Sequence, residues 1–123
     1  MPLVVRAFPL RRPVQELQAF VAALSTERKT ETAEFYRTYG ISHECWDLQQ
    51  TSTGPWVICV TLVDDVAEAS SRYARSNAQF ARWFKSQVQE LSGINPDEQP
   101  LGPPTSRLFV WSDEQRADSS LRL

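Results

Sequence analysis

The pattern of apolar and polar positions predicts one sheet with helices between its strands. Runs of alternating or continuous apolar residues predict strands over 3–8, 42–50, 55–63 and 107–111. Apolar residues spaced three and four apart predict a helix over about 13–39 and a pair of helices between Asp65 and Gly93. The predicted order is strand, long helix, strand, strand, helix pair, strand. This order indicates an α+β fold with a four-stranded antiparallel sheet and helices on one face.

The first helical region contains a polar interruption. Pro13 suits the first turn, because proline lacks the N–H that would be unpaired there. The apolar stripe weakens between 26 and 32 and resumes at Phe35. We predict one long helix with a solvated middle, and a kink near Ser25 is the alternative. Gly40 matches the left-handed residue that ends many helices.

The connection between the second and third strands predicts how these strands pair. Gly54 in a left-handed conformation would close a three-residue loop. That loop places Trp46 opposite Val60 and Leu48 opposite Ile58. One sheet face then carries Glu44, Trp46, Leu48, Trp56, Ile58, Val60 and Leu62, and the other carries His43, Cys45, Asp47, Val57, Cys59, Thr61 and Val63. A loop one residue shorter would change this grouping, because side chains alternate between faces along a strand.

The third predicted strand is apolar on both sides, which is typical of a sheet covered on both faces. The predicted helices can cover only one face. We therefore expect a homodimer in which a second copy covers the other face.

Capping and turn residues predict where the later helices and the last strand begin. Asp65 with Glu68, and Ser76 with Gln79, each match a capping box at a helix start. The proline-rich segment 95–104 predicts a stiff connection to the last strand. We expect one domain over 1–112, followed by a polar tail over 113–123.

Composition excludes several classes of protein. The 123 residues are 41% hydrophobic and 23% charged, with a net charge of −2. These values are typical of a single globular domain and argue against a nucleic-acid-binding protein. No apolar run is long enough to span a bilayer and no signal peptide is recognisable, so we expect no membrane association and a cytoplasmic location. One histidine and two cysteines are too few for a structural zinc site or a disulfide framework.

Several motifs together resemble an uncharacterised bacterial family of the dimeric α+β barrel superfamily, which has the ferredoxin-like fold. They are Glu44-Cys45-Trp46, Ser76 with Phe80, Trp83-Phe84-Lys85, Gly93 and the closing Phe109-Val110-Trp111. The resemblance covers roughly 2–112. It implies a homodimer with a ligand between sheet and helices, and a function among cofactor-independent monooxygenases, isomerases, cyclases, haem-degrading enzymes and binding domains. Haem degradation does not fit, because those enzymes carry an iron-binding histidine on the helix before the last strand, whereas His43 lies on the second strand.

Two ionisable residues are candidates for acid–base chemistry. Glu44 precedes an apolar cluster, and an inward-facing carboxylate there could act as a general base with Arg6 as its counter-ion. The alternative for Glu44 is a salt bridge at the strand end or a dimer contact. His43 is the only side chain whose ordinary pKa lies near neutrality, and it could work with Asp47 or activate Cys45. The alternative for His43 is a solvated residue near the strand end.

Aromatic residues are candidates for the walls of a ligand site. Trp46, Phe80 and Trp83 add more aromatic surface than a small core requires, although core packing is the alternative explanation. We expect a homodimeric protein that binds a small apolar or aromatic molecule without a metal or other cofactor. The alternative is a non-catalytic binding or interaction module.

Overall fold

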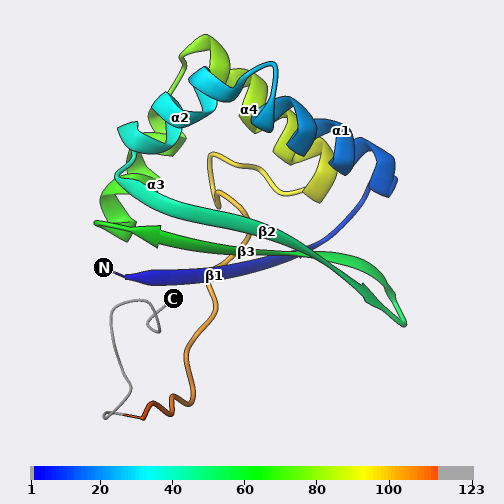
Figure 1. The fold of residues 1–123 in the computed structure, drawn as a ribbon, viewed down its shortest axis with the longest axis vertical. Helices are drawn as coiled ribbons and strands as arrows, with labels where there is room; N and C mark the ends of the chain where they lie inside the picture. The colour runs from blue at the N-terminus through cyan, green and yellow to red at the C-terminus, as the bar shows by residue number, and fades with distance from the viewer. Residues whose placement is uncertain (1, 114–123) are drawn as a thin grey trace.

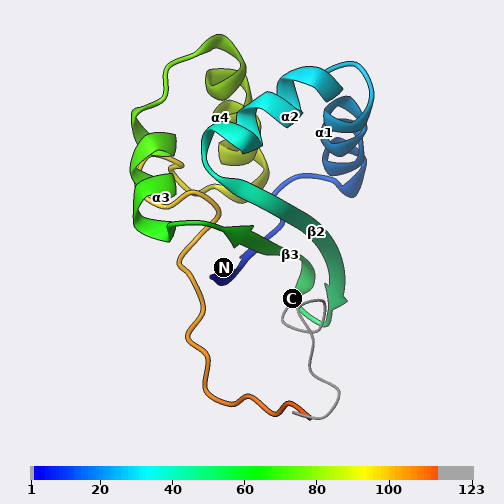
Figure 2. The same ribbon diagram turned by 60° about the vertical axis from the view of Figure 1, so that its left-hand side comes forward.

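The computed structural model describes residues 2–113 and shows an α+β fold (Figure 1). Three antiparallel strands, β1 (Leu3–Pro9), β2 (Ile41–Thr51) and β3 (Gly54–Val63), form a sheet in the order β1-β3-β2. Four helices, α1 (Val14–Ser25), α2 (Lys29–Thr38), α3 (Val66–Arg75) and α4 (Gln79–Ser92), lie on one face of the sheet, as Figures 1 and 2 both show. The face toward the helices is called the inner face below, and the opposite one the outer face.

The predicted single helix over 13–39 is wrong, because residues 26–28 are not helical and separate α1 from α2. The hydroxyls of Ser25 and Thr26 donate to the carbonyls of Val21 and Ala22 at 2.9 and 2.7 Å. Such side-chain bonds compete with helix continuation. The alternative of a kink near Ser25 is closer to the structure. The left-handed conformation of Gly40 is confirmed, with φ of 69°.

The predicted register of the hairpin is also wrong, by one residue. Thr51 pairs with Gly54, so the loop contains two residues instead of three. The Thr51 hydroxyl donates to the Gly54 carbonyl at 2.6 Å and accepts from the backbone N–H of Thr53 at 3.2 Å, which tightens the turn. Trp46 therefore lies opposite Cys59 rather than Val60.

This register regroups the faces of the sheet. Glu44 and Trp46 share the inner face with Val57, Cys59 and Thr61, which are all buried. A register shift between Ile41 and His43 leaves Ser42 as an extra residue on β2. The outer face carries Leu3, Val5, Ala7, Pro9, His43, Cys45, Asp47, Gln49, Trp56, Ile58, Val60 and Leu62.

Helices α3 and α4 confirm one predicted cap and correct the other. The Asp65 carboxylate accepts from the Glu68 N–H at 3.0 Å, as the capping box predicts. Ser76 instead ends α3, and α4 begins at Gln79 after Ala78 without a side-chain cap. The Ser76 carbonyl accepts a bond from Lys85 Nζ at 3.0 Å, which holds the connection between the two helices.

The predicted fourth strand over 107–111 is absent from residues 2–113. The chain reaches the free edge of β1 earlier, where Arg6 and Pro104 form an antiparallel bridge and the Thr105 N–H donates to the Val5 carbonyl at 2.8 Å. Residues 103–112 are exposed. Most of the predicted tail, from 114 onward, lies outside the described residues.

Candidate functional site

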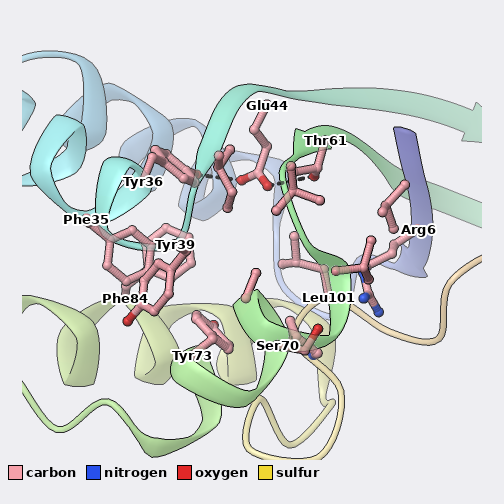
Figure 3. Close-up of a pocket in the computed structure, with 16 residues that line it drawn as sticks. Arg6, Phe35, Tyr36, Tyr39, Glu44, Thr61, Ser70, Tyr73, Phe84 and Leu101 are labelled. Carbon is pink, nitrogen blue, oxygen red and sulfur yellow. Dashed lines mark hydrogen bonds between the residues drawn. The ribbon is translucent and has the colours of Figure 1, made fainter. Parts of the chain in front are cut away.

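A pocket of about 70 Å³ lies between the inner face of the sheet and the helices (Figure 3). It is partly open to solvent, and most of its lining is apolar or aromatic. Its lining residues are Val4, Arg6, Phe35, Tyr36, Tyr39, Ile41, Glu44, Thr61, Val63, Val66, Ala69, Ser70, Tyr73, Phe84, Pro100 and Leu101. A mostly apolar pocket with a few convergent polar groups is typical of a site for a small organic molecule.

Among the residues that the structure describes, Glu44 is the only carboxylate that lines this pocket, and three side chains hold it in place. Its Oε2 accepts hydrogen bonds from the Tyr36 hydroxyl at 2.6 Å and from Trp46 Nε1 at 3.1 Å. Its Oε1 accepts from the Thr61 hydroxyl at 2.8 Å. Figure 3 shows Glu44 between Tyr36 and Thr61. A carboxylate fixed from three directions is held in one orientation relative to the pocket.

These three donors reach Glu44 through the local structure of the sheet and α2. Thr61 is the direct cross-strand partner of Glu44, and Trp46 follows two positions later on the same face. Tyr36 comes from the last turns of α2, which contacts β2 through the turn at Gly40. The corrected hairpin register is therefore what assembles this cluster, since the predicted register would have placed Thr61 on the other face.

Tyr36 is partly buried, and its environment disfavours ionisation. Burial, together with the Glu44 charge and the hydrogen bond to it, raises the pKa of Tyr36 well above its ordinary value. The phenol therefore remains a hydrogen-bond donor to Glu44 at any ordinary pH.

Arg6 brings a buried positive charge to the same pocket. It is 9% exposed, and its Nη1 donates to the Gly102 carbonyl at 2.5 Å. Burial lowers the pKa of Arg6, while Cys59 and Glu44 act in the opposite direction. Among residues 2–113 Arg6 forms no ion pair with a carboxylate. The guanidinium has five N–H donors, and the Gly102 carbonyl accepts from one of its nitrogens. A buried guanidinium of this kind is suited to bind an acceptor group on a ligand.

Gly102 places the carbonyl that holds Arg6. Its φ is 90°, and a Cβ at this position would lie 3.1 Å from the carbonyl oxygen of Ala7. Only glycine adopts this conformation so close to β1 without strain.

Tyr73 lines the pocket from α3, and its hydroxyl is buried. No partner for this hydroxyl is present in the part of the chain that the structure describes. Burial is also the main reason that the pKa of Tyr73 is raised above its ordinary value. A buried donor of this kind favours an acceptor atom on a bound molecule, since an unpaired buried hydroxyl is unfavourable.

The predicted aromatic walls lie in the core beside the pocket rather than on its lining. Trp46 packs at right angles to Phe8 at 6.1 Å between ring centroids, and Trp83 lies 5.4 Å from Phe20. Phe80 is buried in the same core. Trp46 reaches the site only through its N–H bond to Glu44. Trp83 also carries the Arg28 guanidinium over its ring at 4.2 Å, which is a cation–π contact.

His43 and Glu44 are not brought together. His43 lies on the outer face and is exposed, whereas Glu44 faces the pocket. Cys45 and Asp47 share the outer face with His43, but Cys59 is buried on the inner face, where burial raises its pKa. The structure therefore brings Arg6 and Glu44, of the predicted residues, to one pocket.

Sequence reasoning missed the tyrosines of the pocket and the loop at Gly102. Tyr36 and Tyr73 lie on the apolar stripes of their helices, where core packing was a sufficient explanation. No signal marked the loop, which approaches Arg6 from 96 residues further along the chain.

Among residues 2–113, no cluster of three or more histidine, cysteine or acidic side chains could hold a metal ion. In that same part of the chain, no helix has the length and apolar character to cross a membrane. Comparisons of the chain with protein-family models, with curated proteins and with solved structures found no match.

Proposed function

We propose that this chain is a homodimeric protein that binds a small, mostly apolar or aromatic molecule in the pocket between sheet and helices. The observation that carries the proposal is the pocket itself, with Glu44 and Arg6 on its lining. We further propose that the ligand carries an acceptor group, such as a carboxylate, that faces Arg6. Its apolar part would contact Phe35, Tyr39 and Leu101.

The proposed binding of an acceptor group at Arg6 is supported by a difference in hydrogen bonding between Glu44 and Arg6. Both oxygens of Glu44 already accept bonds from the chain itself, while Arg6 has a single bond to a backbone carbonyl. A molecule that enters the pocket can therefore accept hydrogen bonds from the remaining N–H groups of Arg6. The volume of about 70 Å³ suits a molecule of few non-hydrogen atoms, or one end of a larger molecule.

If the protein transforms its ligand, we propose proton transfer at Glu44 without a cofactor, as in the isomerases and cyclases of the superfamily that the sequence resembles. Among residues 2–113, Glu44 is the one carboxylate on the lining, and carboxylates commonly serve as general bases, whereas the raised pKa values of Tyr36 and Tyr73 keep these phenols protonated. The proposed dimeric α+β barrel is supported by the helices on one face only and by the contact of 104–105 with the edge of β1, where a fourth strand would lie.

The alternative is a non-catalytic binding module. The three hydrogen bonds to Glu44 favour it, because they also suit a carboxylate that ties α2 to the sheet. Turnover of a bound compound that is lost in Glu44→Gln, with binding retained, would support the enzyme over the module.

The ligand class is tested with matched pairs of small molecules. Butyrate and benzoate, with butyramide and benzamide as their neutral counterparts, are titrated into the wild type, Arg6→Gln and the exposed control Arg12→Gln. We expect the acids to bind more tightly than the amides, and Arg6→Gln to reduce that preference by about tenfold, which corresponds to one charge-assisted contact. Arg12→Gln should leave it unchanged. Equal binding of acids and amides would contradict the acidic ligand, and no binding by any compound would contradict the pocket as a small-molecule site.

A further inference from the structure

The chain beyond Thr105 presents an exposed apolar segment, called the arm here and comprising residues 106–112. Its four central residues, Leu108, Phe109, Val110 and Trp111, are 95, 83, 60 and 75% exposed. Large apolar side chains exposed side by side mark a surface that binds another molecule.

The arm cannot continue along the edge strand from which it starts. Arg6 pairs with Pro104 in an antiparallel bridge, so an uninterrupted register would bring residue 107 opposite Leu3, the first residue of β1. Leu108 and the residues after it would have no β1 partner. Figures 1 and 2 show that the arm instead extends away from the sheet, on the side opposite the helices.

The outer face of the sheet lies on that same side and is mostly apolar, with His43, Asp47 and Gln49 as its polar residues on β2. Its central residues, Val5, Ile58 and Val60, are only partly buried, and Trp56 and Leu62 extend the apolar surface along β3. The helices do not reach this face (Figure 2). One chain therefore presents both an apolar arm and an apolar sheet surface.

We propose that the arm of one protomer packs on the outer face of a second copy, and that the second copy returns the same contact. The inference rests on the homodimer proposed above and specifies how it is held together. Two copies related by a twofold axis would cover both arms and both faces at once. Successive side chains of an extended arm point to opposite sides, so an arm apolar on both sides requires cover on both sides, as between two facing sheets. Two other occupants of the outer face are possible in principle. One is the arm of the same protomer, and the other is a different protein.

Sedimentation equilibrium of three full-length chains tests the role of the arm. Phe109→Asp/Trp111→Asp places two charges on the arm, and Ser106→Asp/Ser112→Asp places the same charges at its polar ends. We expect the wild type and the serine control to be dimers at about 10 μM, and the first variant to dissociate at least tenfold more readily. Equal dimerisation of all three chains would overturn the arm contact while leaving the homodimer intact. Three monomers would overturn both.

Mixing two defective chains tests the exchange itself. Ile58→Lys should break the outer face, whereas Gln49→Lys, at the exposed rim of that face, should not. A mixture of Ile58→Lys with Phe109→Asp/Trp111→Asp contains one intact arm and one intact face, which can meet only in the mixed dimer. We expect association to return in the mixture, to between the values of the wild type and of either variant alone. A mixture that associates no better than its components would overturn the exchange.

Discussion

Tyr36 donates its phenolic hydrogen to Oε2 of Glu44 at 2.6 Å and so joins α2 to β2 beside the pocket. The same oxygen accepts the indole N–H of Trp46, and Thr61 completes the set through the other oxygen. This cluster links the second helix, the sheet and the aromatic core.

Two tyrosine-to-phenylalanine changes should differ in their effect on stability, because only one of the two hydroxyls has a hydrogen-bond partner among the described residues. Tyr36→Phe removes a hydrogen bond to a carboxylate and should lower the free energy of unfolding by about 1.5–3 kcal/mol. Tyr73→Phe removes a buried hydroxyl that has no partner among the described residues, so it should leave stability unchanged or raise it by up to about 1 kcal/mol. Urea unfolding of both variants measures the difference. Equal losses in the two variants would show that the hydroxyls are equivalent, contrary to the structure.

Replacing Glu44 should separate its charge from its hydrogen bonds. In Glu44→Gln the amide oxygen can still accept from Tyr36 and Trp46, while its NH₂ group donates to Thr61, so we expect a loss of about 1 kcal/mol. Glu44→Leu leaves three partly or fully buried donors without an acceptor and should cost at least about 3 kcal/mol. Thermal and urea unfolding compare the two variants. A leucine variant as stable as the glutamine variant would mean that the donors find other partners.

Gly102→Ala should destabilise the chain more than Gly93→Ala does. Both glycines have positive φ, at 90° and 74°, so each alanine is expected to cost roughly 1–2 kcal/mol in backbone strain. At Gly102 the new Cβ would also lie 3.1 Å from the Ala7 carbonyl, whereas at Gly93 its nearest contact would be an ordinary 3.6 Å. Gly102→Ala should additionally weaken the binding of acids, because the same backbone holds Arg6. Equal effects on stability and no effect on acid binding would argue against this role of the loop.

Stability should fall as the pH rises above about 9. Burial raises the pKa of Cys59, Tyr36 and Tyr73, whose ordinary values are 9.0, 10.0 and 10.0. Above those values the unfolded chain releases protons that the folded chain retains, so each group favours unfolding by about 1.4 kcal/mol per pH unit until its folded-state pKa is reached. Below pH 9 these groups make no pH-dependent contribution.

Urea unfolding between pH 8 and 10.5 measures this slope. Cys59→Ala should reduce the steepness of the decline between pH 9 and 10, where the cysteine is the first of the three groups to contribute, whatever its effect on absolute stability. A free energy of unfolding that stays constant over this range in the wild type would contradict the burial of these groups.

The sequence was sufficient to predict the three strands, the end of α4 at Gly93 and the α+β class. Periodicity and glycine positions carry that information, as at Gly40 and Gly93, which both have positive φ. The hairpin register was not predictable in this way. In the structure the Thr51 hydroxyl bonds to the Gly54 carbonyl across a two-residue loop, a contact that the position of Gly54 alone does not indicate.

The candidate site was predictable only in part, for the same reason. Glu44 and Arg6 were recognisable because charged residues are uncommon within apolar strands. Their surroundings depend on tertiary contacts, since Thr61 faces Glu44 only in the observed register and Gly102 meets Arg6 across 96 residues. The strand expected at 107–111 had the right composition, but in the register of the Arg6–Pro104 bridge all but its first residue would lie beyond the end of β1, the edge that this segment approaches.

The indole N–H signals of the four tryptophans test the central claim, binding in the pocket, most directly. Trp46 Nε1 donates to Glu44 at the pocket, whereas Trp56 lies on the outer face and Trp111 on the exposed arm. In a ¹H–¹⁵N spectrum, with signals assigned through Trp→Phe variants, titration with benzoate or butyrate should shift the Trp46 indole signal and leave those of Trp56 and Trp111 in place. A Trp46 signal that no compound moves, or shifts confined to Trp56 and Trp111, would contradict the proposed site.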